Sequence, residues 1–306
     1  MSVLVCITGR NNEKLMAKLQ DALPDVELKL WPHCDDLESV KFVLAWKAPQ
    51  ELWQKLPNLK VVQSFGAGVD GIPMSILPSG TVVARIIDPQ LSDDMAEYVL
   101  SHALAHKLRH QNYCAEQAKK NWKPRRARKG VTAGVLGLGE LGKAVAQRLS
   151  DNGFTVRGWS RSAKQLDDIA CYYGEAQLAS FASGLDYLVC LLPLTDSTHG
   201  VLNRQLFQNV SNDCLLINVA RGQHLNEQDL IDALNEQELG GAVLDVFTTE
   251  PLPEKHVFWS HPKVTVTPHI AAVTNLDTVV AQIAGNIRAC FTGAPIKNGV
   301  DVTQGY

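Results

Sequence analysis

Three polar residues, a cation, a carboxylate and an imidazole, each follow a short apolar run in the second half of the chain. They are Arg221 after Leu215–Ala220, Glu250 after Ala242–Phe247 and His269 after Val264–Thr267. The runs are short and rich in Val, Leu and Ile, which favours buried strands of a parallel sheet. Ligands bind beyond the carboxyl ends of such strands. We therefore expect the three side chains to meet at one ligand site.

These residue types suit the reduction of a carbonyl group that stands beside a carboxylate. Hydride delivery to a carbonyl carbon develops negative charge on the oxygen, so a proton donor must be near. His269 can be that donor, because an imidazole changes its protonation state near neutral pH. Glu250 would accept the other ring N–H, fix the tautomer and favour the charged acid, and Arg221 can bind a carboxylate bidentately. The trio predicts a 2-oxo acid substrate.

A glycine-rich turn separates a predicted strand, Val131–Gly137, from a predicted helix, Glu140–Ser150. The turn fits the pattern G-x-G-x-x-G and consists of Gly137, Leu138, Gly139, Glu140, Leu141 and Gly142. Its glycines permit in turn a tight bend, a close backbone approach to pyrophosphate and tight helix–strand packing, and the helix N-terminus attracts an anion. A P-loop is disfavoured, because Ala144 stands where magnesium needs a hydroxyl. The turn predicts a dinucleotide site.

The next predicted strand, Phe154–Trp159, bears on which dinucleotide binds. NAD sites usually place Asp or Glu at the end of this strand, where it accepts hydrogen bonds from the ribose. Here the strand is followed by Ser160, Arg161 and Ser162. No carboxylate repels a 2′-phosphate, and a guanidinium with two hydroxyls could hold one. We predict that NADPH/NADP is preferred over NADH/NAD; the alternative is that Arg161 is only an exposed cation.

Length and composition limit the class of protein. A chain of 306 residues favours two domains, and 45% hydrophobic with 20% charged residues is ordinary for a soluble globular protein. The formal net charge of −3 gives no general attraction to nucleic acid or membrane, and no apolar run reaches the length of about 18 residues that spans a bilayer. Seven cysteines without a C-x-x-C pair indicate reduced, buried thiols. With no signal-peptide pattern, we expect a cytoplasmic protein.

Strands and helices alternate in two stretches of the chain, which predicts an α/β fold with parallel sheets covered on both faces. In the first stretch the expected strands are Val3–Thr8, Val26–Trp31, Phe42–Trp46, Leu59–Ser64 and Thr81–Ile86. The second stretch is expected to hold six strands, with Tyr187–Leu192 in addition to those named above. One long helix is expected over 92–120 and a last helix from about Asn275 to Phe291.

Two other features of the sequence could bind something else. His102, His106 and His110 are spaced at i, i+4, i+8, which could ligate a metal, but without H-E-x-x-H we expect a dimer-facing or solvent stripe and no metal site. The segment 119–129 holds seven cations and no acid. We interpret it as a solvated connector between domains, because its one aromatic residue gives no stacking series; nucleic acid or an acidic partner is the alternative. His224 could contact cofactor or substrate, or lie at the surface.

Several segments of the chain resemble the signatures of D-2-hydroxyacid dehydrogenases, and the resemblance runs nearly end to end. They are Asn218–Gly222, Leu244–Pro253, Thr267–Ala272 and Ser64–Asp70. Three further segments are similar to the glyoxylate/hydroxypyruvate reductase A branch of that family: Ala45–Pro49, Trp159–Arg161 and Gly305–Tyr306. That branch prefers NADPH, in agreement with the prediction made from the end of Phe154–Trp159.

The resemblance implies a fold and an activity. The expected fold is a Rossmann doubly wound parallel sheet domain for NADP(H), residues 97–279, and a discontinuous flavodoxin-like α/β substrate domain, residues 1–96 and 280–306. The expected activity is NADPH-dependent reduction of small 2-oxo acids, glyoxylate to glycolate and hydroxypyruvate to D-glycerate, with His269 as general acid, in a homodimer built on the cofactor domain. The alternative is an NADP(H)-sensing binding protein of this fold without turnover.

The resemblance also implies roles for further residues. The backbone amides of Ala67, Gly68 and Val69 would hold the substrate carboxylate together with Arg221, and Trp46 would form a wall of the pocket. Asp245 would receive the carboxamide of the nicotinamide. The remaining residues expected to line the cofactor site are Leu192, Pro193, Val219, Ala220 and Ala271.

Overall fold

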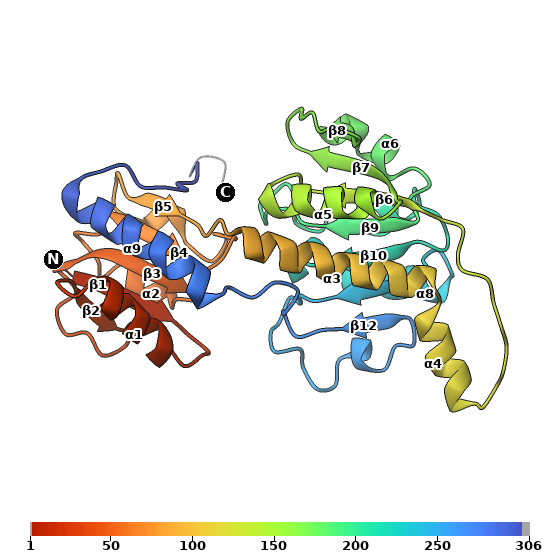
Figure 1. The fold of residues 1–306 in the computed structure, drawn as a ribbon, viewed down its shortest axis with the longest axis horizontal. Helices are drawn as coiled ribbons and strands as arrows, with labels where there is room; N and C mark the ends of the chain where they lie inside the picture. Colours follow the sequence, from red (N-terminus) through yellow and green to blue (C-terminus); the bar gives the residue numbers. More distant parts are fainter. Residues whose placement is uncertain (1, 302–306) are drawn as a thin grey trace. The chain divides into compact units, whose positions relative to one another are not determined.

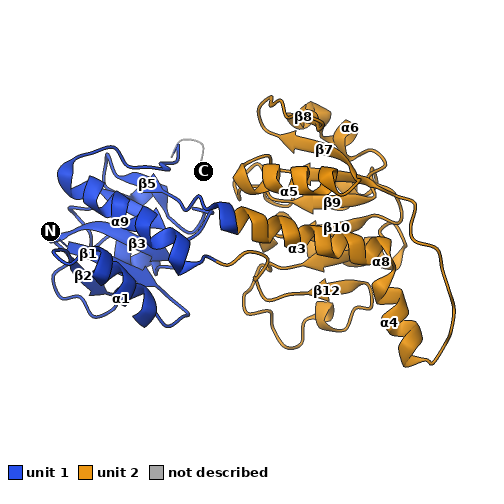
Figure 2. Ribbon diagram, viewed as in Figure 1, with its two compact units in different colours: residues 1–90, 274–306 blue, residues 91–273 orange. Residues whose placement is uncertain are grey.

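The computed structural model describes residues 2–301, which form two compact units (Figures 1 and 2). Unit 1 comprises residues 1–90 and 274–306, and unit 2 comprises residues 91–273. The boundaries expected from the sequence, at 96 and 279, lie inside two helices, α3 (Pro89–Lys107) and α9 (Leu276–Thr292). The pair Gly305–Tyr306 lies outside the described residues.

Unit 1 is built on a five-stranded parallel sheet with the order β2-β1-β3-β4-β5. Its strands are β1 Ser2–Ile7, β2 Glu27–Leu30, β3 Val40–Trp46, β4 Val61–Ser64 and β5 Val82–Ala84. This is the flavodoxin-like order, and each strand overlaps an expected one. The helices of this unit besides α9 are α1 Glu13–Ala22, α2 Gln50–Trp53 and the short 3-10 helix η1 Met74–Ile76.

The two faces of this sheet are covered by different helices. Side chains of a strand alternate between the faces, so neighbouring residues of β1 pack against different helices. Val3 and Val5 of β1 belong to the cluster that contains Ile283 of α9. Leu4 of the same strand belongs instead to the cluster that contains Trp53 of α2. The last helix of the chain therefore completes the core of the first unit.

Unit 2 is built on a seven-stranded parallel sheet with the order β12-β11-β10-β9-β6-β7-β8. Its strands are β6 Thr132–Leu136, β7 Thr155–Ser160, β8 Ala170–Tyr173, β9 Tyr187–Cys190, β10 Leu215–Asn218, β11 Gly241–Leu244 and β12 Val264–Val266. The order reverses between β6 and β9, as in the Rossmann fold. Six strands were expected and confirmed. The expectation missed β8, an edge strand in which no residue is buried.

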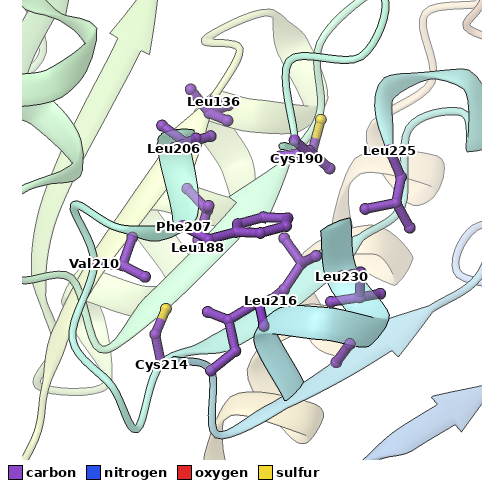
Figure 3. Close-up of a cluster of buried hydrophobic side chains, with 14 of the residues drawn as sticks. Leu136, Leu188, Cys190, Leu206, Phe207, Val210, Cys214, Leu216, Leu225 and Leu230 are labelled. Atoms are coloured by element: carbon purple, nitrogen blue, oxygen red, sulfur yellow. The ribbon is translucent and has the colours of Figure 1, made fainter. Parts of the chain in front are cut away.

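The core of unit 2 lies on both faces of this sheet. Leu188 and Cys190 of β9 face the cluster drawn in Figure 3, which includes Phe207, whereas Val189 faces a second cluster with Val99 of α3. The helices of this unit besides α3 are α4 His110–Ala118, α5 Glu140–Asp151, α6 Leu178–Ala182, α7 Arg204–Phe207, α8 Glu227–Asn235, and the 3-10 helices η2 Glu175–Gln177, η3 Gly222–His224 and η4 Val257–Trp259. No helix within residues 2–301 is long and apolar enough to span a membrane.

The single helix expected over 92–120 is wrong. The chain forms α3 and α4 with a break at Arg109, whose backbone is left-handed (φ +63°) and whose Nε donates to the carbonyl of Arg126. No glycine or proline marks the break. The segment 119–130 then runs as an extended loop from α4 to β6 (Figure 1). It lies inside unit 2, so the expectation of a connector between domains is also wrong.

Candidate active site

Arg221 lies in the turn after β10, in extended backbone (φ −144°) at the start of η3. Its backbone is held from both sides. Asn218 Nδ2 donates to its carbonyl oxygen at 3.0 Å, and its own N–H donates to His224 Nδ1 at 3.2 Å. Nη1 of the guanidinium donates to the carbonyl of Ala220 at 2.7 Å. The half-buried side chain therefore starts from a fixed backbone.

Gly222 joins this turn to the turn after β11. A Cβ at this position would lie 2.0 Å from the carbonyl carbon of Phe247 and 2.2 Å from the nitrogen of Thr248. The two backbones are thus in direct contact, and only glycine permits that approach. The turn that carries Arg221 is consequently packed against the segment that leads to Glu250.

His269 and Glu250 form a hydrogen-bonded pair. His269 Nδ1 lies 3.1 Å from Glu250 Oε1 and 3.0 Å from Oε2. Oε1 also accepts the N–H of Phe247 at 3.2 Å, which holds the carboxylate in place. The side chains are 31% and 20% exposed. With Nδ1 directed to the carboxylate, Nε2 is the ring nitrogen on the opposite side, where a general acid would hold its proton.

Asp245 organises the turn that carries His269. Its side chain is 1% exposed. Oδ1 accepts from Thr267 Oγ1 at 2.6 Å and from the N–H of Ile270 at 2.9 Å, and Oδ2 accepts from the N–H of Ala271 at 2.9 Å. Its backbone carbonyl accepts the N–H of His269 at 2.8 Å. These bonds hold His269 in left-handed backbone (φ +56°). A contact between Asp245 and a nicotinamide carboxamide stays a prediction.

Two residues of α3 extend this network and were missed by sequence reasoning. Tyr98 Oη lies 2.6 Å from Thr267 Oγ1, and burial raises the pKa of Tyr98 to about 12. The ring of His102 packs against that of Tyr98 in a tilted arrangement, with 4.5 Å between centroids, and burial lowers the pKa of His102. The sequence gives no local signal for these two residues, because their position near the site depends on how α3 packs against the end of β12.

The glycine turn has the geometry that a dinucleotide requires. Gly137 has a φ of +98°, and a Cβ on it would lie 2.6 Å from the carbonyl oxygen of Leu191. A Cβ on Gly142 would lie 1.8 Å from the carbonyl oxygen of Gly137. Gly139, by contrast, has no atom within 4 Å of where its Cβ would be, and it caps the N-terminus of α5. The turn is therefore closed on the protein side and open where a pyrophosphate would approach.

The end of β7 carries the polar residues that the sequence indicated. Ser160 is buried and its Oγ donates to the carbonyl of Ser162 at 2.8 Å, while Arg161 and Ser162 are exposed. Lys164, which was not among the expected site residues, donates from Nζ to the carbonyl of Leu138 at 2.6 Å. Its ammonium therefore lies at the glycine turn, and its position four residues after β7 was the available signal.

The other residues expected around the cofactor have buried side chains, with one half-buried exception. Leu192 and Ala220 belong to the core cluster on one face of the sheet, and Val219 and Ala271 belong to the cluster on the other face. Pro193 is half-buried. Any contact of the four buried residues with a ligand would therefore fall mainly to their backbone atoms.

The loop expected to hold a substrate carboxylate belongs to unit 1 and follows β4. Ser64 Oγ donates to the carbonyl of Gly68 at 2.6 Å and accepts the N–H of Gly66 at 3.2 Å, which folds the loop back on the strand. A Cβ on Gly66 would lie 2.5 Å from the ring of Trp46, so this ring packs on the loop. Ala67 and Gly68 are half-buried and Val69 is buried.

The histidines outside the trio differ from expectation. His224 is fully buried, so the surface alternative is wrong. His110 lies beyond the helix break, and the ring of His106 packs on Tyr187 at 5.6 Å between centroids, so the three histidines do not form a stripe on one helix. Within residues 2–301, no group of three or more His, Cys, Asp or Glu side chains is arranged to hold a metal ion.

The cysteines of the chain are unpaired in the described structure. Cys6, Cys190, Cys214 and Cys290 are buried, as expected, and burial raises the pKa of each thiol. Cys34 and Cys171 are half-buried, and Cys114 on α4 is exposed. The expectation that all seven fill the interior is therefore wrong for Cys114.

A family model and a similar protein sequence both indicate the same family. Residues 100–271 match the family model described as D-isomer specific 2-hydroxyacid dehydrogenase, NAD binding domain. The chain is 42% identical over 304 residues, 97% of both sequences, to glyoxylate/hydroxypyruvate reductase A from Serratia proteamaculans (strain 568).

Solved structures match over the whole chain, among them the following two. One is an NADPH-dependent glyoxylate/hydroxypyruvate reductase from Sinorhizobium meliloti in complex with NADP and sulfate, with a TM-score of 0.92, 34% identity and 100% of both chains covered. The other is a probable 2-hydroxyacid dehydrogenase from Rhizobium etli CFN 42 in complex with NADP, HEPES and L(+)-tartaric acid, with a TM-score of 0.90, 33% identity and coverage of 100% of this chain and 99% of that one.

Proposed function

Because the chain belongs to the D-isomer specific 2-hydroxyacid dehydrogenase family, we propose that it reduces small 2-oxo acids with NADPH. Glyoxylate, giving glycolate, and hydroxypyruvate, giving D-glycerate, are the proposed substrates. The relative from Serratia proteamaculans is named for glyoxylate and hydroxypyruvate, the two proposed substrates. The relative from Rhizobium etli was solved with NADP and a small hydroxy acid, tartaric acid, which supports the same class of ligand.

The observation that carries this proposal is the hydrogen bond between His269 Nδ1 and Glu250 at 3.0 Å. A histidine whose one nitrogen is held by a carboxylate is a suitable general acid, because the carboxylate fixes the tautomer and stabilises the imidazolium. His269 would protonate the carbonyl oxygen through Nε2. Arg221 would bind the substrate carboxylate as a fork.

The cofactor site fits NADPH in two respects. Gly139 leaves open space at the N-terminus of α5, where the pyrophosphate would bind. The end of β7 offers Arg161 and Ser162, both exposed, and the ammonium of Lys164 lies at the glycine turn, so three polar groups without a carboxylate could hold a 2′-phosphate. When bound, NADPH supplies the hydride for the carbonyl carbon.

The test is the oxidation of NADPH, followed by its absorbance, with a series of 2-oxo acids and with NADH in parallel. We expect turnover with glyoxylate and hydroxypyruvate, and a higher kcat/KM with NADPH than with NADH. If no 2-oxo acid accelerates NADPH oxidation although NADPH binds, the chain is an NADP(H)-sensing protein instead. A higher kcat/KM with NADH would contradict the role of Arg161.

We also propose that two copies pair through unit 2. Helix α4 buries none of its own residues, and Trp122 in the following segment is 96% exposed, which leaves a large exposed surface around α4. The measurement is the mass in solution by light scattering. We expect a dimer that Trp122→Ser weakens; a monomer at micromolar concentration would contradict the proposal.

A further inference from the structure

His224 is a histidine of unit 2 to which the proposed reaction assigns no role. It ends η3, three residues after Arg221, and it is fully buried. Buried polar groups are expensive unless they are hydrogen-bonded. A leucine would suit the surrounding core, which includes Leu202 and Leu225, so the imidazole must contribute through its two nitrogens.

The two nitrogens of His224 reach two different turns. Nδ1 lies 3.2 Å from the backbone nitrogen of Arg221, and Nε2 lies 3.3 Å from the carbonyl oxygen of Pro193. A neutral ring protonated on Nε2 satisfies both, because Nδ1 then accepts the N–H of Arg221 and Nε2–H donates to Pro193. Nδ1 also lies 3.2 Å from the carbonyl oxygen of Arg221, but a proton on Nδ1 would leave Nε2 with no hydrogen to donate to the Pro193 carbonyl. The ring thus bridges the turn after β10 and the turn after β9.

Both turns belong to the proposed site. Arg221 is proposed to bind the substrate carboxylate, and Pro193 is expected beside the cofactor. The Pro193 carbonyl also accepts from Thr198 Oγ1 at 2.7 Å, so it belongs to an ordered turn. On the other side Gly222 is in backbone contact with Phe247, so the Arg221 turn has little freedom to shift away from the ring.

We infer that His224 is a positioning residue that couples the turn holding Arg221 to the cofactor turn at Pro193. Each ring nitrogen has its own task, since Nδ1 orients the Arg221 backbone and Nε2 orients the Pro193 carbonyl. This inference rests on the proposed function for the roles of the two turns. It does not make His224 a proton donor to the substrate.

The two tasks can be separated with amide side chains. His224→Asn places an acceptor near the Nδ1 position and loses the donor to Pro193, whereas His224→Gln places a donor near the Nε2 position and loses the acceptor for Arg221. His224→Leu loses both. His256 provides a matched control, because its Nδ1 also accepts a backbone N–H, that of Phe258, and its Nε2 contacts Glu227.

The measurements are the Kd for NADPH by fluorescence without substrate, kcat and KM for glyoxylate, and the Tm of each free protein. Leaving a buried group unpaired corresponds to about a five- to tenfold change in affinity or more. We expect His224→Gln to raise KM with a near-normal Kd, His224→Asn to raise Kd with a near-normal KM, and His224→Leu to raise both. His256→Leu should lower only Tm.

If the three His224 variants lower Tm but keep wild-type Kd and KM, the histidine is a packing residue and the inference is overturned. The same conclusion holds if Asn and Gln show no difference from each other. Absence of turnover in the wild-type protein would instead refute the proposed function. The Kd series would still decide whether His224 orients the Pro193 turn, because it needs no reaction.

Discussion

In the seven-stranded sheet, the carboxyl ends of the parallel strands form one edge and their amino ends form the opposite edge. Both edges carry charged residues and histidine, but they are built differently. At the carboxyl edge, the carboxylate of Asp245 accepts three hydrogen bonds from the turn that holds His269, and both nitrogens of His224 have partners. At the amino edge, both nitrogens of His106 are buried without a hydrogen-bond partner among the described residues. Burial lowers the pKa of His106, and the nearby positive charges of Arg128 and Arg109 lower it further.

The amino edge borders a cavity whose lining is rich in Arg and Lys. Its volume is about 670 Å³, and it is lined by His106, Arg109, Lys123, Arg125, Arg126, Ala127, Arg128, Lys129, Gly130, Asp186, Tyr187 and Asp213. Arg128 forms an ion pair with Asp213. The two edges therefore differ in how their histidines are held: the ring nitrogens of His224 and Nδ1 of His269 have hydrogen-bond partners, whereas those of His106 have none among the described residues.

The largest effect is expected at the carboxyl edge from His269→Gln. Loss of a positioned general acid should reduce turnover by about 10²–10⁴-fold, while the Kd for NADPH should stay near the wild-type value, because His269 is not among the residues proposed to hold the cofactor. Single-turnover kinetics and fluorescence titration give the two numbers. The matched variant at the amino edge, His106→Gln, should retain wild-type turnover. Equal losses at both edges would refute the comparison.

Arg221→Ala comes next. Removal of a charge-assisted, bidentate contact raises the KM for glyoxylate about 100-fold, and kcat falls less than KM rises. The control is Arg148→Ala, because Arg148 makes an exposed ion pair with Asp93, and such pairs contribute little. A wild-type KM in the Arg221 variant would remove this residue from substrate binding.

Arg161→Ala sharpens the proposal for the cofactor. We expect the ratio of kcat/KM for NADPH to that for NADH to fall about tenfold, since one contact to a phosphate is lost. Lys164→Ala should lower the same ratio by a smaller factor. An unchanged ratio in both variants would mean that the 2′-phosphate is recognised elsewhere.

The smallest effect concerns the pH dependence of stability at the amino edge. Burial, with Arg128 and Arg109, lowers the pKa of His106 to about 4, against the ordinary 6.5. Between these values the unfolded chain binds a proton that the folded chain does not, so stability falls as the pH falls through this range. His106→Leu should reduce the loss of Tm between pH 7 and pH 5 by roughly 2–4 °C. Parallel Tm curves for the two proteins would contradict this.

The elements that position the trio were predictable because their signals are local. β10 and β11, which precede Arg221 and Glu250, are fully buried in parallel sheet, and β12, which precedes His269, is half-buried. All three strands lie in short apolar runs of the sequence, and the polar residues that follow these runs are visible there. The glycine turn was predictable for the same reason, because Gly137 has a positive φ and Gly142 permits a contact that no side chain allows.

The remaining features depend on tertiary contacts that leave no local pattern. The break at Arg109 occurs in a stretch of good helix formers and coincides with a hydrogen bond to residue 126. The bridge made by His224 joins Arg221 to Pro193, which lies 31 positions before His224 in the chain. Tyr98 and Thr267 are still further apart. Composition and periodicity cannot place such partners together.

The central claim is that, at the carboxyl edge of the seven-stranded sheet, bound NADPH would supply a hydride to the carbonyl carbon of a 2-oxo acid while His269 would supply the proton. The most direct measurement is mass spectrometry of the product formed from glyoxylate and NADPH that is dideuterated at C4 of the nicotinamide. We expect glycolate with one deuterium at C2 from the wild-type protein, and almost none in the same time from His269→Gln. Glycolate without deuterium, or equal amounts of labelled product from both proteins, would contradict the account.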